Sequence, residues 1–228
     1  MHLEDLNWMD VEKYLQQEDR LMLVTGSTEQ HAYLSLLTDI KIPLALADAA
    51  SQATGVLVAP PLNFGVAPYF LAYPGTLSLR AATLCSAVED IVRSAYGHGF
   101  RRILVVNGHG GNSPARSHLQ EVNNTLPDLR LNWYDWWLSS SVQAVAMKHN
   151  LKPSHANWLE AFPFTIVAEM PDGVKTPPNV PSAIMDAKTA RSVYGDGSFG
   201  GAYRAPEDVM QEIFTACLQD VLQLLKFD

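Results

Sequence analysis

The sequence predicts an α/β fold in which helices cover both faces of a mostly parallel sheet. Strand-like runs alternate with longer helical segments along the 228 residues, an order that is typical of parallel sheets. The two clearest runs, LMLV at 21–24 and RRILVV at 101–106, each contain consecutive aliphatic residues. We therefore expect these strands to be buried on both faces. The length suits a single domain over residues 1–228.

The remaining elements follow from periodicity and from breaks at glycine and proline. Helices are expected at 7–18, 43–51, 76–96, 113–126 and 207–226. Strands are expected at 21–24, 54–60, 101–106 and 129–137, and residues 161–170 are a further candidate. A long loop at 61–75 is rich in glycine, proline and aromatic residues, and loops of that length are often functional. Ligands of such sheets bind beyond the carboxyl ends of the strands.

Composition excludes several classes of function. The chain has 16 Lys and Arg against 24 Asp and Glu, a net charge of −8, so we expect neither nucleic-acid nor anionic-membrane binding. The acidic start of the sequence is unlike a signal peptide, and no apolar run reaches membrane-spanning length. Cys85 and Cys217 form no CxxC pair and are expected to be buried free thiols. A cytoplasmic location is the resulting expectation.

The first polar cluster follows the strand at 21–24 and contains Glu29, His31 and Asp39. In extended backbone, residues two apart point to the same side, so Glu29 and His31 are expected to face one cavity. A carboxylate with an imidazole suits zinc, manganese or another divalent ion. Taken alone, this stretch favours an ordinary polar loop, because such a pattern is common by chance.

The second cluster, NGHGGN at 107–112, is more specific. It places His109 among Gly108, Gly110 and Gly111, between an aliphatic strand and a helix. Glycines allow the backbone to approach a bound group closely, and their peptide N–H groups can stabilise an oxyanion. A tight turn with a solvent-facing histidine is the alternative. We favour the functional interpretation, because so many glycines are a costly way to build a mere turn.

Two weaker clusters lie further along the chain. His155 and Glu160 are five residues apart, and one of them is expected to be a ligand while the other acts as an acid or base. Trp136 and Trp137 close a tryptophan-rich strand, where aromatic side chains either join the core or line a pocket.

Nucleotide binding finds no support in the sequence. Residues 195–200 (GDGSFG) match GxGxxG but follow no strand. We expect this stretch to be a flexible loop near the active site or a subunit contact. Neither a phosphate loop nor a GxSxG nucleophile elbow is present.

Taken together, the clusters resemble the creatininase family of metal-dependent amidohydrolases. The resemblance extends over about residues 7–215 and keeps the order and spacing of the family's motifs. These motifs stand here as Gly26-Ser27-Thr28-Glu29-Gln30-His31, Thr38-Asp39, Tyr73-Pro74-Gly75-Thr76, Asn107 to Asn112, and His155-Ala156 with Glu160.

The resemblance implies a three-layer α/β/α sandwich that holds two divalent metal ions, zinc and/or manganese. Glu29, Asp39 and His109 would hold one ion. His31, Asp39 and Glu160 would hold the other, with Asp39 bridging the two. Relatives assemble as hexamers, so we also expect a homo-oligomer.

The implied activity is hydrolysis of a C–N amide bond in a small molecule such as a cyclic amide or a formamide. A metal-bridging water would be the nucleophile, and His155 would protonate the leaving nitrogen. The glycine-loop residues listed above would contact the substrate, and so would Tyr33, Trp136 and Trp137.

The chain departs from the family pattern around this site. Ala32-Tyr33-Leu34 replaces Gly-Pro-His, the stretch from Glu29 to Asp39 is one residue shorter, and Gly111 stands where some members carry glutamate. We therefore expect this loop to set the substrate. Two alternatives remain: a small-peptide hydrolase, and a metal- or ligand-binding protein without turnover.

Overall fold

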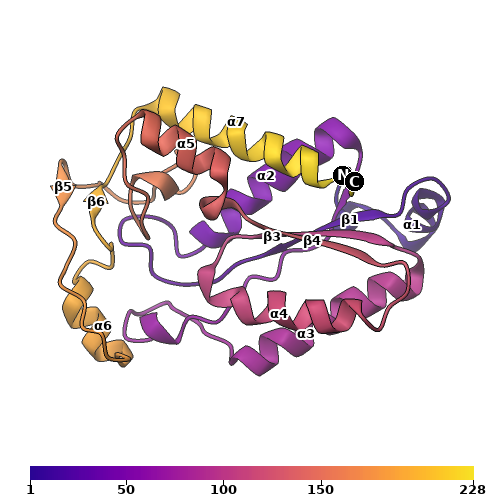
Figure 1. Cartoon of the computed structure of the whole chain (residues 1–228), viewed down its shortest axis with the longest axis horizontal. Helices are drawn as coiled ribbons and strands as arrows, with labels where there is room; N and C mark the ends of the chain where they lie inside the picture. The colour runs from indigo at the N-terminus through magenta and orange to yellow at the C-terminus, as the bar shows by residue number, and fades with distance from the viewer.

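In the computed structural model, which describes residues 1–228, a four-stranded parallel sheet lies between two layers of helices (Figure 1). The strand order is β2-β1-β3-β4. The strands are β1 (Arg20–Thr25), β2 (Leu57–Val58), β3 (Arg102–Asn107) and β4 (Arg130–Asp135). In the register, Thr25, Asn107 and Asp135 lie side by side at the carboxyl ends. The predicted α/β class with a parallel sheet is confirmed.

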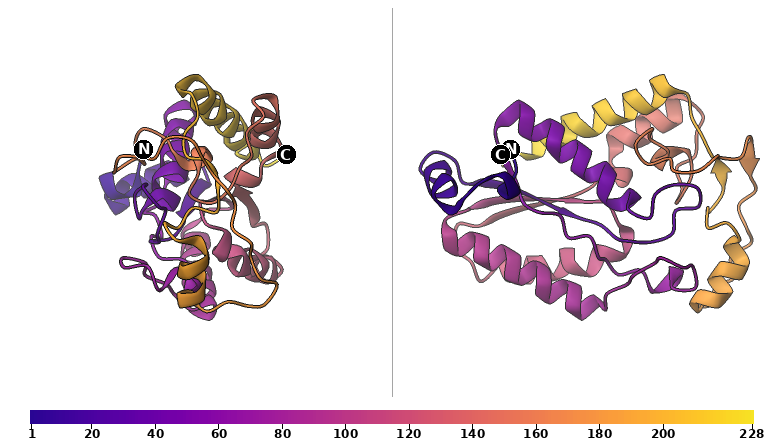
Figure 2. Two further views of the ribbon diagram at one scale, coloured as in Figure 1. Left: turned by 90° about the vertical axis from the view of Figure 1, so that its left-hand side faces the viewer. Right: turned by 180° about the vertical axis from the view of Figure 1, so that it is seen from behind.

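The helices form one layer on each face of the sheet. On one face lie α2 (Thr38–Thr54), α5 (Ser140–Lys148) and α7 (Glu207–Leu224), as Figures 1 and 2 show. The other face is covered by α3 (Ala81–His98) and α4 (Ser113–Asn123). No helix has both the length and the apolar character needed to cross a bilayer.

The two ends of the sheet carry different elements. The short helix α1 (Trp8–Leu15) precedes β1 at the amino ends of the strands. Beyond the carboxyl ends, an outer lobe contains α6 (Ala187–Tyr194) and a two-stranded antiparallel pair, β5 (Val174–Lys175) and β6 (Gly201–Ala202). This lobe therefore lies at the end of the sheet where ligands of α/β proteins bind.

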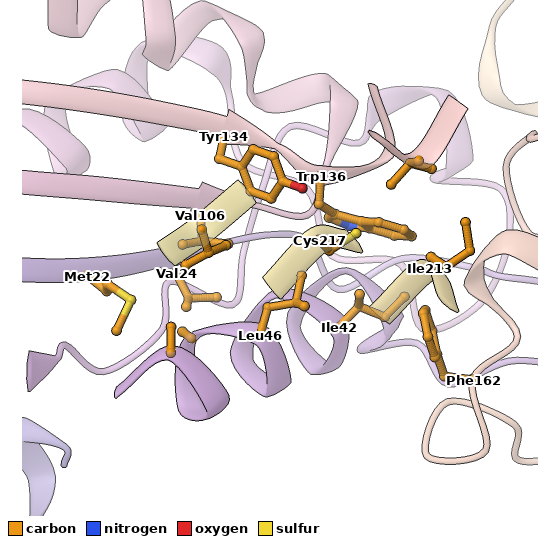
Figure 3. Packing of buried hydrophobic residues seen from close by; sticks show 14 of the residues in the cluster. Met22, Val24, Ile42, Leu46, Val106, Tyr134, Trp136, Phe162, Ile213 and Cys217 are labelled. Atoms are coloured by element: carbon orange, nitrogen blue, oxygen red, sulfur yellow. The ribbon is translucent and has the colours of Figure 1, made fainter. Parts of the chain in front are cut away.

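Alternating side chains divide the interior into two cores. Met22 and Val24 of β1 join the cluster beneath α2, α5 and α7, where they pack with residues such as Leu46 and Ile213 (Figure 3). Leu21 and Leu23 point the opposite way, into the cluster beneath α3 and α4. This period of two is that of a pleated strand, and burial on both faces explains why the whole run is aliphatic.

Several boundaries differ from the sequence-based expectation. Helix α2 begins at Thr38, not at 43, so Pro43 lies inside it. Proline is typical of the first helical turn, which makes such a start hard to recognise. The candidate strand at 161–170 does not form; this stretch makes one isolated bridge, between Ile166 and Leu34. The other expected elements keep their type but shorten or shift: strand 54–60 to Leu57–Val58, helix 76–96 to Ala81–His98, and strand 129–137 to Arg130–Asp135.

Candidate active site

Three loops at the carboxyl edge of the sheet bring the predicted polar residues together. Glu29 and His31 lie between β1 and α2, and Asp39 lies in the first turn of α2. His109 follows β3, whereas Glu160 ends the 3-10 helix Trp158–Glu160. All five residues are buried, with relative exposures of 9% or less. The structure thus joins groups that are up to 131 residues apart in the sequence.

Asp39 is at the centre of this cluster. Its Oδ1 lies 2.9 Å from Nε2 of His31, and its Oδ2 lies 3.0 Å from Nδ1 of His109. Glu29 Oε1 is 3.4 Å from the same His109 nitrogen, and Glu160 Oε1 is 3.8 Å from the His31 nitrogen. These side chains form two groups of possible metal ligands that share Asp39. One group is Glu29, Asp39 and His109, and the other is His31, Asp39 and Glu160.

Backbone carbonyls orient both imidazoles toward the carboxylates. The Nδ1 of His31 lies 3.2 Å from the carbonyl of Glu29, and the Nε2 of His109 lies 2.9 Å from the carbonyl of Val66. A carbonyl oxygen only accepts, so each of these nitrogens must donate. In the neutral ring, the other nitrogen then carries a lone pair directed at the carboxylates. This arrangement is common around metal-bound histidines.

Buried polar atoms without partners support a fit to cations. Three buried side-chain atoms make no hydrogen bond: Glu29 Oε2, His31 Nε2 and Asp39 Oδ2. Two of them are nevertheless close to the cluster, because His31 Nε2 lies 2.9 Å from a carboxylate oxygen of Asp39, and Asp39 Oδ2 lies 3.0 Å from a ring nitrogen of His109. An unpaired buried polar atom costs about 1–3 kcal/mol. Oxygen and nitrogen atoms that converge without hydrogen-bond geometry suit divalent ions such as zinc and manganese.

The ionisation of the cluster depends on how burial and the neighbouring charges act on each group. Burial raises the pKa of Glu160 to about 7 and also raises that of Glu29. Burial alone would lower the pKa of His31, but the carboxylates of Asp39 and Glu160 raise it to about 10. Burial would also raise the pKa of Asp39, yet His31 and His109 hold it below its ordinary value. Without a cation, protons on the histidines must balance the carboxylates.

Two glycines allow α2 to approach the strand ends closely enough to place Asp39. A Cβ on Gly26 would lie 2.2 Å from the backbone oxygen of Asp39, and one on Gly108 would lie 1.9 Å from it. Pro43 has no N–H to offer this oxygen, which is its i−4 carbonyl in the helix. One glycine of each sequence motif, Gly26 and Gly108, is thus required by the close contact of the strand ends with α2.

Two asparagines that the sequence analysis did not assign hold the strand ends in place. Asn107 accepts from Thr25 Oγ1 at 3.0 Å and donates to Asp135 Oδ1 at 2.7 Å, linking β1, β3 and β4. Asn112 donates to the carbonyl of Gly26 at 3.1 Å. The signal was present in the sequence, since both asparagines flank the glycine motif, but their partners belong to other strands.

A cavity of about 520 Å³ opens beside the cluster. The sequence-predicted residues on its wall are Glu29, Asp39, Gly108, His109, Gly110, Gly111, Trp137, His155 and Glu160. The loop at 61–75 contributes four more lining residues: Val66, Ala67, Tyr69 and Phe70. Phe199, from the glycine-rich stretch 195–200, also lines it. No lysine or arginine lines the cavity, and aromatic side chains form part of its wall around an acidic centre.

Two residues expected to contact substrate lie elsewhere. Trp136 is 1% exposed and belongs to the core beneath α2, α5 and α7. Both tryptophans belong to the 3-10 helix Trp136–Leu138, which points their side chains in different directions. Only Trp137 lines the cavity. Tyr33 packs edge-on against Tyr203, with ring centroids 5.7 Å apart, and does not line the cavity. The backbone turns at Ala32, where φ is 51°, and this carries Tyr33 away from the cluster.

His155 has a separate environment on the cavity wall. Its ring is stacked on Phe70, with centroids 4.7 Å apart and an interplanar angle of 14°. Burial lowers the pKa of His155 well below its ordinary value, and the neighbouring His31 lowers it further. A nitrogen of His155 also lies close enough to Glu29 and His31 to form a third ligand-type group.

An α/β fold with a buried carboxylate–histidine cluster beside a cavity defines a class of protein that can hold divalent cations at its strand ends. The chain belongs to the creatininase family: the family model described as creatinine amidohydrolase matches residues 4–225.

Curated relatives carry two kinds of name. Creatinine amidohydrolase of Pseudomonas putida is 35% identical over 116 residues, which cover 48% of this chain and 45% of that protein. Mycofactocin precursor peptide peptidase of Mycolicibacterium smegmatis is 37% identical over 102 residues, covering 42% and 41%. The chain thus spans less than half the length of these curated relatives.

Solved creatininase structures share the fold. A structure named Creatininase Mn aligns with a TM-score of 0.82 at 22% identity, over 97% of this chain and 96% of that one. Another, of creatinine amidohydrolase, aligns with a TM-score of 0.81 at 22% identity, over 97% and 95%. The three-layer α/β/α architecture expected from the motifs is therefore confirmed.

Proposed function

We propose that this protein is a metal-dependent hydrolase that cleaves a C–N amide bond. The observation that carries the proposal is Asp39, whose two carboxylate oxygens lie 2.9 Å and 3.0 Å from two different histidines. Glu29, Asp39 and His109 would hold one divalent cation, and His31, Asp39 and Glu160 the other. The names of solved relatives, which include manganese and Zn-Zn forms, support zinc or manganese as the ions. When bound, two such ions polarise a carbonyl and supply hydroxide at neutral pH.

The glycine loop would stabilise negative charge on the substrate oxygen. The N–H of Gly108 is already committed, because it donates to the carbonyl of Thr25 at 2.8 Å. Gly110 and Gly111 stand at the first two positions of a 3-10 helix, where N–H groups have no intrahelical acceptor. Both residues line the cavity. We therefore assign the oxyanion contact to Gly110 and Gly111, and a structural role to Gly108.

His155 would carry the proton for the leaving nitrogen. It lies on the wall of the cavity and is kept neutral by its low pKa. The stacked ring of Phe70 fixes its plane. A neutral imidazole in a fixed orientation can exchange a proton with the reacting group, which contributes about 10²- to 10⁴-fold in rate.

Hydrolysis of a small peptide is the second candidate, and the cavity favours it. Its volume of about 520 Å³ is in the range that holds drug-sized ligands, larger than a single small cyclic amide needs. Tyr69, Phe70 and Phe199 give it an aromatic wall. Four curated relatives are also named peptide peptidases. Cyclic amides, formamides and short peptides with apolar side chains should therefore be compared directly.

Metal analysis of the purified protein tests the proposal. We expect about two zinc or manganese ions per chain, and fewer in Glu29→Gln. The matched control is Glu89→Gln on α3, where the carboxylate bonds Arg93 and His118 and the ion content should not change. A protein that binds no ions, with no amide hydrolysis after zinc or manganese is added, would refute it. Bound ions without turnover would favour the binding-protein alternative.

A further inference from the structure

Gln30 lies between two candidate ligands, Glu29 and His31, and is only 5% exposed. It belongs to neither of the two groups that share Asp39. Its side-chain amide instead contacts His155, whose Nε2 lies 2.9 Å from the Gln30 Nε2. The amide therefore acts on the residue that the proposed reaction uses as proton carrier.

Two backbone groups fix which way the Gln30 amide faces. Its Oε1 accepts from the N–H of Ala32 at 3.1 Å, and its Nε2 donates to the carbonyl of Gly197 at 3.1 Å. Turning the amide over would place two acceptors together at Gly197 and two donors together at Ala32. The amide nitrogen must therefore be the atom that faces His155, and it can only donate.

A donor at this position decides where His155 carries its proton. The Nε2 of His155 accepts from the Gln30 amide, and in a neutral imidazole the other nitrogen then holds the hydrogen. In the opposite tautomer, the Nε2–H of His155 would point at the N–H of the Gln30 amide, and no hydrogen bond could form. Phe70 is stacked on the imidazole, and the ring centroid of Phe199 lies 4.9 Å from that of His155. The imidazole therefore cannot turn over without disturbing both aromatic rings.

The acceptor that holds Gln30 belongs to the glycine-rich stretch 195–200, which is itself firmly attached. Lys175 of β5 bonds the carboxylate of Asp196 and donates to the carbonyls of Tyr194 and Ser198 at 2.6 Å and 2.7 Å. The hydroxyl of Tyr203 donates to Asp196 at 2.6 Å. These contacts hold the Gly197 carbonyl in place, so the outer lobe contributes a fixed hydrogen-bond acceptor to the site.

Gly197 makes this contact because it lacks a side chain. Its φ is +102°, and a Cβ there would lie 1.7 Å from Oε1 of Gln30. We propose that Gln30 is a positioning residue: anchored by Gly197, its amide holds His155 as the Nδ1–H tautomer, so that Nδ1–H is the donor that the ring offers to the leaving nitrogen. The catalytic part of this inference rests on the proposed function. The tautomer itself is a property of the chain.

The tautomer can be measured without any substrate. In protein labelled with ¹⁵N-histidine, studied as purified and again after zinc addition, we expect His155 to show a protonated Nδ1 and an unprotonated Nε2. The His155→Ala spectrum assigns the signal. Gln30→Met keeps the side-chain volume but removes the donor, so it should mix the two tautomers. Gln30→Glu offers an acceptor instead and should move the proton to Nε2.

Gly197→Ala tests the anchor without changing Gln30 or His155. We expect it to displace the amide and alter the His155 signals. Gly195→Ala is the matched control, because Gly195 lies in the same loop with φ +61° but a Cβ there would meet nothing within 4 Å. It should keep the wild-type tautomer, which separates loss of the anchor from general backbone strain.

Kinetics supply the second measurement, on whichever amide the enzyme cleaves. Gln30→Met should lower kcat by about 10-fold or more, with metal content retained and KM changed by less than about threefold. An unchanged His155 tautomer in Gln30→Met and Gly197→Ala would overturn the proposal, as would a change confined to KM. If no amide is cleaved at all, the proposed function fails, while the tautomer measurement still decides the role of the Gln30 amide.

Discussion

Each end of the central sheet carries a cluster of charged side chains, but only one of the two clusters contains arginines that pair with its acids. At the amino ends, Glu18 pairs with Arg20 at 2.5 Å and with Arg102 at 3.3 Å. Arg102 also bonds Asp19. Two acids thus meet two arginines, and the charges balance.

At the carboxyl ends, the three buried acids of the candidate site have no such partners. Glu29, Asp39 and Glu160 converge on histidines, and no lysine or arginine lines the adjoining cavity. Because burying unbalanced charge is costly, this cluster is a candidate site for cations from outside the chain. The difference teaches that an acidic cluster becomes a candidate metal site when it is buried and the chain supplies no permanent cation to it.

The largest effect is expected from Asp39→Asn, because Asp39 belongs to both candidate ligand groups. Both ions should be lost or weakened, and the rate of amide hydrolysis should fall by about 10³-fold or more. Metal analysis and kcat/KM are the measurements. Full metal occupancy with unchanged turnover would show that the carboxyl-end cluster is not a metal centre.

His155→Ala should be the next largest. The metal content should persist while kcat falls by about 10²-fold or more, because a proton carrier is lost but neither ligand group that contains Asp39 is altered. The control is His98→Ala at the exposed end of α3, which should leave kcat unchanged. Loss of metal from His155→Ala would instead assign His155 to the third group, with Glu29 and His31.

Cation binding should also stabilise the fold, because it completes the charge balance. At a free zinc or manganese concentration of 100 times Kd, the free energy of unfolding should rise by about 2.7 kcal/mol per site. Thermal unfolding with and without chelator measures this rise. The increase should be much smaller in Asp39→Asn. Equal melting temperatures for the wild-type protein in metal and in chelator would contradict the comparison between the two ends.

The smallest effect is expected at the amino ends. Arg20→Met keeps the aliphatic stem but removes one of the two arginine partners of Glu18, and it should cost about 1 kcal/mol in urea unfolding. Metal content and kcat should not change. The hydrogen bond from Arg20 holds the pKa of Glu18 below its ordinary value of 4.5. The stabilisation is therefore present above that pH, is lost as pH falls through the lowered pKa, and should be smaller in the variant, where Arg102 still pairs with Glu18.

The sequence determined the two central strands of the sheet and the chemical types in the site. The aliphatic runs at 21–24 and 103–106 lie within β1 and β3, because only a strand buried on both faces needs such a run. The motifs also named the residues that the structure brings together: Glu29, Asp39 and His109 stand at one edge of the sheet. Parallel strands place their carboxyl ends side by side, so loops that are distant in the sequence had to meet there.

Only the tertiary structure decided what each neighbouring residue contacts. Trp136 and Trp137 are alike in sequence, yet one turn of 3-10 helix sends the first into the core and leaves the second on the cavity wall. Gln30 looks like a spacer between two ligands until Gly197, 167 residues away, accepts from its amide. Such assignments depend on partners that are far apart in the chain, and local sequence patterns encode periodicity but not the packing of one loop against another.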